Sequence, residues 1–350
     1  MGITIKDIAK IAGVSTSTVS LVISGKGYVS ETTREKVQVV IDEYNYKPSR
    51  SAQQLVSQRS GNIGFIISDI HLSRSEAFYT RILLGAELEA RNYNMYILLT
   101  TVGDKIDVPA GIPRFINSQD VDGLVIAGSV PVALVEYVHK LRIPTVLIDF
   151  KVNQTNMDAV RMDNRDGAQQ IVKHLVDLNI SKIGFVGGSY YHPSIKERFE
   201  GYQAAMALHG LGAIAQNSDY HYLIEYETSP ECGQRGLSKI LEKVPEIEAV
   251  ICVNDTTATG CLQYVRSINK KVPEEIKIVG FDNVNFSAIT HPPLTTVNVP
   301  KVQMGVEALK LLMDRIDNGQ QVHQTRLIPV ELIVRGSTMK NGSQVQTIDK

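Results

Sequence analysis

Apolar residues in the first fifty positions recur at helical spacing, and polar breaks divide them into short segments. Thr4 and Asp7 have the spacing of a capping box at the start of a helix. An apolar stripe at helical spacing follows, formed by Ile8, Ile11 and Ala12. The pattern predicts that this first helix ends at residues 13–15, because this break contains a glycine and a serine able to cap the next helix.

A second helix is predicted from about Thr16 to Ile23, and a third from Glu31 to about Tyr44. Val19, Val22 and Ile23 of the second helix face inward, and its other side carries short hydroxyl side chains, namely Thr16, Ser17, Thr18 and Ser20. A helix that enters the major groove of DNA needs such small donors and acceptors near its N-terminal end. The third helix is predicted to complete a three-helix core with Val37, Ile41 and Tyr44.

A short polar segment follows the three helices. Pro48 ends the third helical region, and residues 49–56 are rich in Gln and Ser. Because this segment is too polar to bury itself, we expect it to stay loose alone and to form a helix on DNA. Leu55 suits a wedge driven between base steps in the minor groove. We therefore place a helix-turn-helix domain at residues 1–48 and a hinge helix with its linker at 49–61.

The run TIKDIAKIAGVSTSTVSLVISGKGYVSETTREKVQVVIDEYNYKPSRSAQQL, residues 4–55, resembles without a gap the DNA-binding end of the lactose-repressor (LacI/GalR) family of bacterial transcription regulators. The resemblance implies a homodimer whose two heads bind the halves of a palindromic operator in double-stranded DNA. Base contacts are expected from Thr16, Ser17 and Ser20. Leu21 stands where family members often carry a polar residue that reads a base. As an apolar side chain it is expected to make at most a contact with a thymine methyl group.

Two further sets of DNA contacts are expected from the same resemblance. The phosphate contacts are Thr4, Ser15, Thr18, Arg34 and Lys36. The contacts of the hinge are Ser49, Arg50, Ala52, Gln53 and Leu55.

After the head, short β-rich runs alternate with amphipathic helices, a pattern typical of parallel sheets covered on both faces. The predicted strands are Ile63–Ser68, Met95–Thr100, Leu124–Ala127, Thr145–Ile148, Ala159–Met162, Lys182–Val186, Ala249–Val253, Ile276–Phe281 and Arg326–Arg335. The predicted helices are Glu76–Arg91, Val132–Leu141, Gly167–Leu178, Lys196–His209, Glu231–Leu241, Thr256–Ile268 and Val302–Ile316. The series is too long for one lobe and divides near residues 160–163.

The resemblance implies a two-lobed α/β body like that of periplasmic binding proteins, at residues 62–338. The chain is expected to cross between the lobes near residues 160, 292 and 322. The N-lobe is then about 62–160 and 292–321, and the C-lobe about 161–291 and 322–338. The family's usual long helix at 104–113 must be shortened, because Pro109, Gly111 and Pro113 fall there. Residues 339–350 are polar and are expected to be disordered.

Composition adds an uneven charge to this picture. The whole chain has a net charge of −1, whereas residues 1–60 carry +3 and the remainder −4. A mildly basic head on an acidic body fits contact with phosphates by the head only. Three cysteines without CxxC spacing argue against a disulfide framework or a zinc site and fit a reducing cytoplasm. No apolar stretch approaches the length of about 18 residues that a membrane span needs, and no signal peptide is evident.

Polar residues follow the predicted strands, at the edge where open α/β sheets bind ligands. They are Asp69, Ser129, Asp149, Gly188, Ser189, Asn254, Asp255 and Asp282. Carboxylates and amides suit a polyhydroxylated ligand, because they accept from or donate to its hydroxyl groups. Aromatic side chains that could supply the apolar contact of such a pocket are Phe78, Tyr79, Tyr191 and Phe286.

Three further runs resemble signature segments of the same family: RFEGY at residues 198–202, ICVNDTTATG at 251–260 and VGFDN at 279–283. The resemblance implies that Arg198 and Asp282 bind the effector, with Asn254 and Asp149 next. From the residues alone, Arg198 could simply pair with neighbouring glutamates on an exposed helix. Asp282 and Asn254 could simply cap the turn and the helix that follow them, so both alternatives stay open.

The sequence gives little support for an enzyme. It contains no Walker A run, no GxGxxG after the first strand, no GxSxG and no HExxH, so no cofactor or metal is expected. A periplasmic sugar-binding protein would share the body, but it would need a signal peptide in place of the DNA-binding head. We therefore predict a cytoplasmic repressor of carbohydrate-utilisation genes that a small sugar releases from its operator. Control by a corepressor or a protein partner is the alternative.

Overall fold

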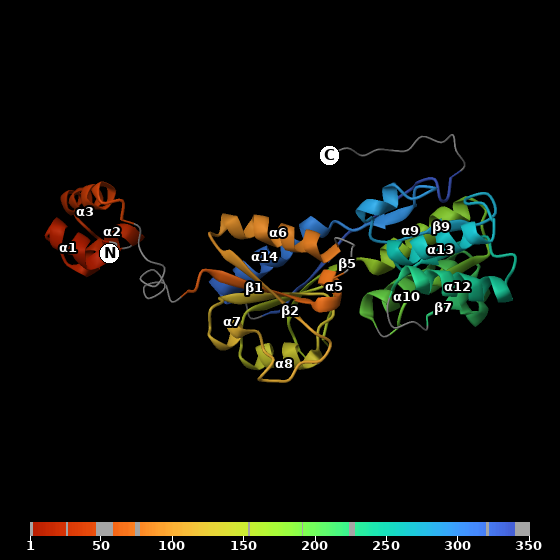
Figure 1. Cartoon of the computed structure of the whole chain (residues 1–350), viewed down its shortest axis with the longest axis horizontal. Helices are drawn as coiled ribbons and strands as arrows, with labels where there is room; N and C mark the ends of the chain where they lie inside the picture. Colours follow the sequence, from red (N-terminus) through yellow and green to blue (C-terminus); the bar gives the residue numbers. More distant parts are fainter. Residues whose placement is uncertain are drawn as a thin grey trace. The chain divides into compact units, whose positions relative to one another are not determined.

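The chain folds into two compact units that meet at residues 61 and 62 (Figure 1). The computed structural model describes residues 3–25, 27–46, 59–73, 78–152, 155–190, 192–223, 228–319 and 322–339. The predicted hinge contacts Ser49, Arg50, Ala52, Gln53 and Leu55 lie outside the described residues, as does Tyr191.

The head consists of three helices with well-formed N-terminal caps: α1 (Ile5–Ala12), α2 (Thr16–Ser24) and α3 (Glu31–Glu43). The predicted capping box is confirmed, because the Thr4 N–H donates to the Asp7 carboxylate at 2.9 Å and the Asp7 N–H donates to Thr4 Oγ1 at 3.4 Å. Gly13 ends α1 with φ 68°, in the left-handed region that favours glycine. The Ser15 hydroxyl then accepts from the Thr18 N–H at 3.1 Å and starts α2.

The core of the head differs from the predicted one at Tyr44. This residue is 45% exposed, so its prediction as a core residue is wrong. On the apolar stripe of the first helix, Ile11 is 47% exposed. Ala9 is buried instead of Ile11, because the face of α1 that meets the other helices carries Ile8 and Ala9. Tyr44 ends α3, and the N–H of Tyr46 then donates back to the Ile41 carbonyl at 2.9 Å. This turn places Tyr46 in the core instead.

The first lobe of the body is built on a six-stranded parallel sheet in the order β11-β5-β4-β3-β1-β2. Its strands are β1 (Asn62–Ser68), β2 (Tyr96–Val102), β3 (Gly123–Ala127), β4 (Thr145–Ile148), β5 (Asp158–Met162) and β11 (Thr325–Ile328). Figure 1 shows one face covered by α6 (Phe78–Asn92) and α14 (Lys301–Asn318), and the other by α7 (Arg114–Asn117) and α8 (Val132–Lys140). The short helix α5 (Asp69–Ser73) follows β1.

The second lobe contains a four-stranded parallel sheet in the order β7-β6-β8-β9. Its strands are β6 (Ile183–Val186), β7 (His221–Tyr222), β8 (Ala249–Cys252) and β9 (Lys277–Val279). Helices α9 (Asn164–Asp177) and α10 (Pro193–Leu208) pack on one face, and α12 (Pro230–Lys243) and α13 (Asp255–Ser267) on the other. The short helix α11 (Gly212–Gln216) and the 3-10 turns η1 (Ser218–Tyr220) and η2 (Asn285–Ala288) complete the lobe.

The strands predicted before residue 282 are all present, with ends that differ by one or two residues. Strands β7 and β10 (Thr296–Asn298) were not predicted, because runs of two or three residues are too short to show a period. The expected shortening after residue 104 is observed: α7 has four residues and begins directly after Pro113.

The strand pairing corrects two of the three expected crossings between the lobes. Strand β10 lies beside the second sheet, because Thr295 bridges to Val279 and Asn298 bridges to Asp282. The second crossing therefore follows residue 298 and does not lie near 292. Strand β11 pairs with β5 in the first sheet, so the third crossing follows Ile328 and does not lie near 322.

A proline explains why the predicted strand Arg326–Arg335 is two strands. After β11 the chain reaches Pro329, which has no N–H to donate to a ladder. The chain then crosses and forms β12 (Glu331–Ile333), which pairs antiparallel with β10.

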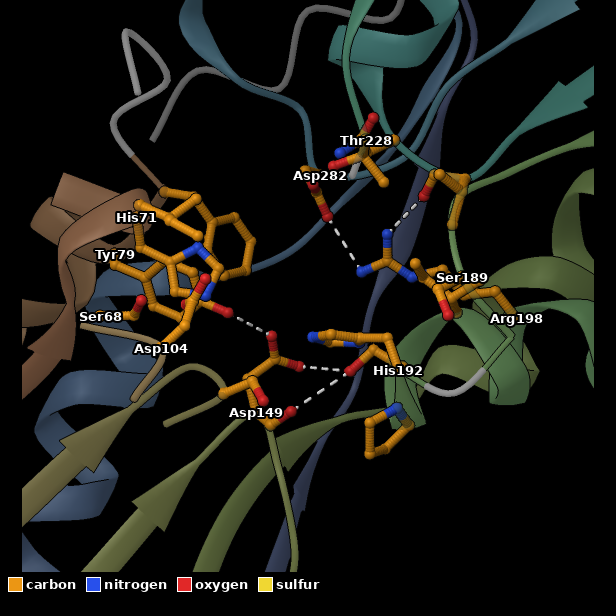
Figure 2. A pocket seen from close by; sticks show the side chains of 18 residues that line it. Ser68, His71, Tyr79, Asp104, Asp149, Ser189, His192, Arg198, Thr228 and Asp282 are labelled. Carbon is orange, nitrogen blue, oxygen red and sulfur yellow. Dashed lines mark hydrogen bonds and ion pairs between the residues drawn. The ribbon is translucent and has the colours of Figure 1, made fainter. Parts of the chain in front are cut away.

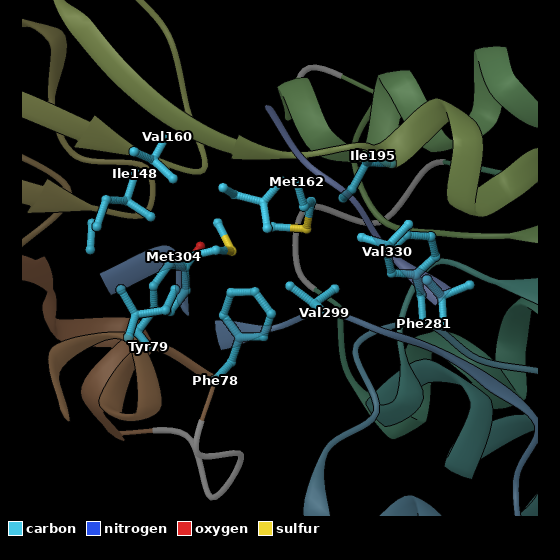
Figure 3. Packing of buried hydrophobic residues seen from close by; sticks show 14 of the residues in the cluster. Phe78, Tyr79, Ile148, Val160, Met162, Ile195, Phe281, Val299, Met304 and Val330 are labelled. Atoms are coloured by element: carbon cyan, nitrogen blue, oxygen red, sulfur yellow. The ribbon is translucent and has the colours of Figure 1, made fainter. Parts of the chain in front are cut away.

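Apolar side chains fill the junction where the chain crosses between the lobes (Figure 3). Met162, Val299 and Val330 on the crossing segments belong to the same buried cluster as Met304 of α14 and Phe281 of the second lobe. Methionine side chains are unbranched and adapt to irregular spaces. The two lobes therefore share one continuous apolar core at the crossings.

Asp158→Ala is expected to destabilise the fold strongly. The Asp158 carboxylate is fully buried and accepts from Arg315 of α14, both from Nε and from Nη2 at 3.0 Å, and from the Gln324 N–H at 2.7 Å. Removing it takes the buried counter-charge from the guanidinium of Arg315, whose side chain is 12% exposed, and we expect a cost of about 3 kcal/mol. Urea denaturation measures the loss. Asp177→Ala is the matched control, because Asp177 forms only an exposed pair with Lys173 on α9 and should change stability by less than about 1 kcal/mol.

Candidate functional site

A cavity of about 330 Å³ lies between the strand ends of the two lobes (Figure 2). The first lobe lines it with Ser68, Ile70, His71, Phe78, Tyr79, Asp104, Ser129 and Asp149. The second lobe lines it with Ser189, His192, Pro193, Ser194, Ile195, Arg198, Thr228, Val253, Asn254 and Asp282. This volume is within the range of small-molecule sites, roughly 300–1,000 Å³, and the cavity lies where open α/β sheets bind ligands.

Asp149 connects the two lobes at the floor of this cavity. It follows β4 with φ 68°, a strained conformation for a non-glycine residue that is typical of functional sites. One carboxylate oxygen accepts from the Tyr79 hydroxyl at 2.8 Å. The other accepts from the Ser194 hydroxyl at 2.7 Å, and Ser194 lies in the first turn of α10 in the second lobe. Both Asp149 and Ser194 are buried, so this hydrogen bond between the lobes is shielded from water.

The environment of Asp149 also affects Tyr79. Burial, and then the negative charge of Asp149, raise the pKa of Tyr79 well above its ordinary range. The Tyr79 hydroxyl therefore remains protonated and acts as a donor. Its ring lies 4.4 Å from that of His71, and a side chain at Gly128 would collide with both rings.

Arg198 has a planar network of partners in the second lobe. Its Nε donates to Asn164 Oδ1 at 2.9 Å, and its Nη1 donates to the Val253 carbonyl at 2.5 Å. Its Nη2 forms an ion pair with Asp282 at 3.1 Å. The guanidinium lies over the Phe281 ring, 3.7 Å from the centroid. Only 6% of Arg198 is exposed, so it is held in place before any ligand arrives.

Asp282 is held on its other side by a residue of the first lobe. Lys301, at the start of α14, donates from Nζ to the Asp282 carbonyl and to the Val299 carbonyl at 3.0 Å. Burial lowers the pKa of Lys301, and the negative charge of Asp282 opposes this shift. Asp282 itself has φ 104°. The first lobe therefore holds the backbone of Asp282, and Arg198 of the second lobe holds its carboxylate.

Asn254 and Asp255 follow β8 at the start of α13, and of the two only Asn254 lines the cavity. Asn254 lines the cavity while its Oδ1 caps α13 by accepting from the Thr257 N–H at 2.9 Å. Asp255 points away from the cavity and accepts from Thr296 Oγ1 at 2.5 Å and from the Val284 N–H at 2.9 Å. Burial, and then the charge of Asp282, raise the pKa of Asp255 to about 7.

Most of the predicted effector contacts line this one cavity, namely Phe78, Tyr79, Asp149, Arg198, Asn254 and Asp282. Phe286 does not. It lies in the η2 turn, half-buried, because the chain bends at Asp282 and Asn283 and only the first of these reaches the cavity. Arg198 does not pair with neighbouring glutamates: Glu197 pairs with Arg161, and Glu200 pairs with Arg165.

Several residues that line the cavity were not predicted, including His71, His192 and Ser194. Ser194 stands four residues before Arg198, which places both on the same face of α10. That spacing was the available signal. No comparable signal exists for His71, which comes into the cavity only because α5 turns back after β1.

In the head, the outer face of α2 carries the predicted base contacts. Thr16 and Ser17 are exposed, and Ser20 is half-buried. Leu21 is 38% exposed, and its side chain packs against Gly27. Of the predicted phosphate contacts, Lys36 is exposed and Arg34 half-buried on α3. The hydroxyls of Thr4, Ser15 and Thr18 form hydrogen bonds in the caps of α1 and α2. A contact of these hydroxyls with a phosphate would have to be made in addition to those hydrogen bonds.

Two kinds of feature are absent from the part of the chain that the structure describes. No helix there is long and apolar enough to span a bilayer. No group of three or more His, Cys, Asp or Glu side chains there could hold a metal ion.

A helix-turn-helix head followed by a two-lobed body with a polar cavity between its lobes defines a DNA-binding regulator that responds to a ligand. Residues 4–49 match the family described as bacterial regulatory proteins, lacI family, and residues 172–338 match a periplasmic binding protein-like domain. The chain is 30% identical over 336 residues to the ribose operon repressor of Haemophilus influenzae, which covers 95% of this chain and 98% of that one. It is 30% identical over 339 residues to the repressor PurR of Vibrio campbellii, and this match covers 96% of this chain and 99% of PurR.

Solved structures agree with these relatives. The Lac repressor dimer bound to operator and the anti-inducer ONPF has a TM-score of 0.78 and 26% identity, and the match covers 97% of this chain and 100% of that one. The complex of the transcriptional regulator CelR with cellobiose has a TM-score of 0.72 and 26% identity, and the match covers 96% of this chain and 99% of the CelR chain. The chain belongs to the LacI family. It is a DNA-binding transcriptional repressor controlled by a small-molecule effector, and it is not an enzyme.

Ionisation of Asp255 should lower the free energy of unfolding of the parent as the pH rises, and Asp255→Asn should remove this pH dependence. Its pKa is raised from 3.8 to about 7 in the folded state, so the folded chain keeps a proton that the unfolded chain releases. The stability contributed by this proton is complete below about pH 4 and is lost as the pH rises to about 7. We expect the free energy of unfolding of Asp255→Asn, minus that of the parent, to rise across this window and then level off. Urea denaturation from pH 4 to pH 8 measures it, and a difference that does not change with pH would contradict the assignment.

Proposed function

We propose that this repressor acts in the cytoplasm as a homodimer on a near-palindromic operator of carbohydrate-utilisation genes, and that a small sugar bound between its lobes releases it. The observation that carries the proposal is the cavity in which Asp149, Arg198 and Asp282 are already oriented. Oriented carboxylate and guanidinium groups suit the paired hydroxyls of a sugar. The CelR structure was solved with cellobiose, and another LacI-family structure, 26% identical, was solved with ribose.

The apolar outer face of the first lobe supports a dimer. Leu84 and Leu88 lie one turn apart on α6 and are each 43% exposed, and Tyr96 and Leu99 on the edge strand β2 are 57% and 45% exposed. Tyr96 and Leu99 are three residues apart on a strand, so their side chains point to opposite faces of the sheet. Exposed apolar residues on such an edge mark an interaction surface, and an open edge strand needs a cover. Tyr96 is the register partner of Asn62, the first residue of the body. A dimer through this face would therefore bring two linkers close together.

The proposed switch follows from the residues that both lobes share. Asp149 accepts from Ser194 across the cavity, and Lys301 holds Asp282 across the second crossing. A ligand that binds between these groups changes how the lobes sit against each other, and so whether two hinges can meet on DNA. The ligand shifts this equilibrium only by its difference in affinity for the two arrangements.

Fluorescence anisotropy on a palindrome from the DNA upstream of the gene tests the proposal. The full chain should bind this DNA, and one member of a panel of mono- and disaccharides should release it. The measurement is the apparent Kd for DNA with and without each sugar. A sugar that tightens binding would contradict induction and favour a corepressor. No effect of any sugar would count against a sugar effector.

Arg198→Lys should weaken the response to the effector while leaving operator binding by the free protein within about twofold. Lysine keeps the charge but lacks the planar fork that joins Asn164, Val253 and Asp282, so we expect at least about a tenfold loss of effector affinity. Arg165→Lys is the matched control, because Arg165 is about half exposed and pairs with Glu200 outside the cavity. An effector response of Arg198→Lys equal to that of the control would show that Arg198 is only structural.

A further inference from the structure

Negative charges outnumber positive ones around the cavity between the lobes. Three carboxylates line it, those of Asp104, Asp149 and Asp282, against the single guanidinium of Arg198. Together these four groups give a net charge of −2, from −3 and +1. Behind this lining, the carboxyl group of Asp255 has a pKa of about 7 and Lys301 donates to the Asp282 carbonyl, so these two groups do not add to the negative charge of the cavity. A ligand that carried its own negative charge would approach these groups in a partly desolvated space, where charges repel more strongly than in water.

The one cation is already committed to the protein. Each nitrogen of Arg198 has a partner at hydrogen-bond distance, and one of these is the carboxylate of Asp282 at 3.1 Å. The ring of Phe281 covers a face of the guanidinium at 3.7 Å. A phosphate or carboxylate that approached the guanidinium would have to share its charge with Asp282. The carboxylate of Asp282 would repel that anion at short range in a partly desolvated space.

The carboxylate of Asp149 already accepts two hydroxyl groups. Those of Tyr79 and Ser194 donate to its two oxygens at 2.8 and 2.7 Å. Ligand hydroxyls offer the same chemistry and can share or replace these bonds without any change of charge. The apolar side chains of Ile70, Phe78 and Ile195 in the same lining provide a surface for the C–H groups of a sugar ring.

We propose that the cavity takes an uncharged polyhydroxylated ligand, a free saccharide or glycoside, and rejects phosphorylated sugars and other anions. The inference rests on the effector role proposed above for this cavity. It names the charge of the ligand, which the relatives do not determine. Like charges placed against the wrong partner are a general means of specificity. Here the excess of carboxylates would serve to distinguish a free sugar from its phosphate.

Isothermal titration calorimetry on the full chain tests this with matched pairs. The probes are neutral mono- and disaccharides that include D-ribose, D-glucose and cellobiose, and the anionic counterparts ribose 5-phosphate, glucose 6-phosphate and cellobionate. We expect a neutral sugar to bind at least about tenfold more tightly than its anionic partner. Raising the salt concentration should narrow this ratio, because salt screens the repulsion of the anion only. Equal or tighter binding of the anion, or no binding by any neutral member, would overturn the proposal.

Asp104→Asn removes a negative charge from the cavity lining while keeping the size of the side chain, so it separates the effect of charge from that of shape on ligand affinity. Asp104 is exposed at the rim of the cavity, so removing its charge should narrow the ratio of neutral to anionic affinity by about twofold to fivefold. Asp107→Asn is the matched control, because Asp107 is an exposed carboxylate in the same loop that does not line the cavity. A ratio that moves equally in both variants, or in neither, would overturn the electrostatic basis. Operator binding measured on the same samples tests the repressor function separately. A protein that binds operator but has a higher affinity for the anionic sugar would contradict only the inference about ligand charge.

Discussion

A guanidinium group buried away from water must be surrounded by acceptors, and this requirement organises the ligand site. Arg198 lies on α10, yet its partners come from the start of α9, the end of β8 and the loop after β9. The three segments must therefore converge on one side chain. Because Phe281 packs under the same group, the site is rigid in the second lobe before any ligand binds. Such preorganisation reduces the entropy that binding would otherwise cost.

The first lobe contributes a complementary group that both lobes can reach. Asp149 stands at the end of β4 in a strained conformation and accepts hydroxyls from Tyr79 in its own lobe and Ser194 in the other. The crossings beneath it are filled by adaptable side chains, including Met162 and Met304. A single core therefore joins the lobes, while a few hydrogen bonds at the cavity depend on the angle between them. Ligand chemistry can bias that angle because the same atoms serve both purposes.

The acidic lining gives this site a preference that its fold alone does not imply. Family members with the same architecture differ in the molecules found with them, as the cellobiose and ribose structures show. The backbone fixes where the strand ends lie, whereas the charges of residues such as Asp104 decide which ligand can remain there. Fold and specificity are thus set by different residues.

The sequence by itself determined most helices and strands in their order, the capping of α1 and α2, and the strand ends where the cavity lies. It did not show β7, β10 or the division between β11 and β12. These features depend on local spacing, since Thr4 with Asp7, or a buried run such as Ile63–Ser68, acts within a few residues. Only the tertiary structure decided that β11 joins the first sheet, that β10 lies beside the second, and that Ser194 donates to Asp149. Such pairings join residues distant in the chain, so no local period reports them. For the same reason Tyr46 replaced Tyr44 in the core of the head: one turn of the backbone after α3, invisible in the apolar pattern, reversed which side chain is buried.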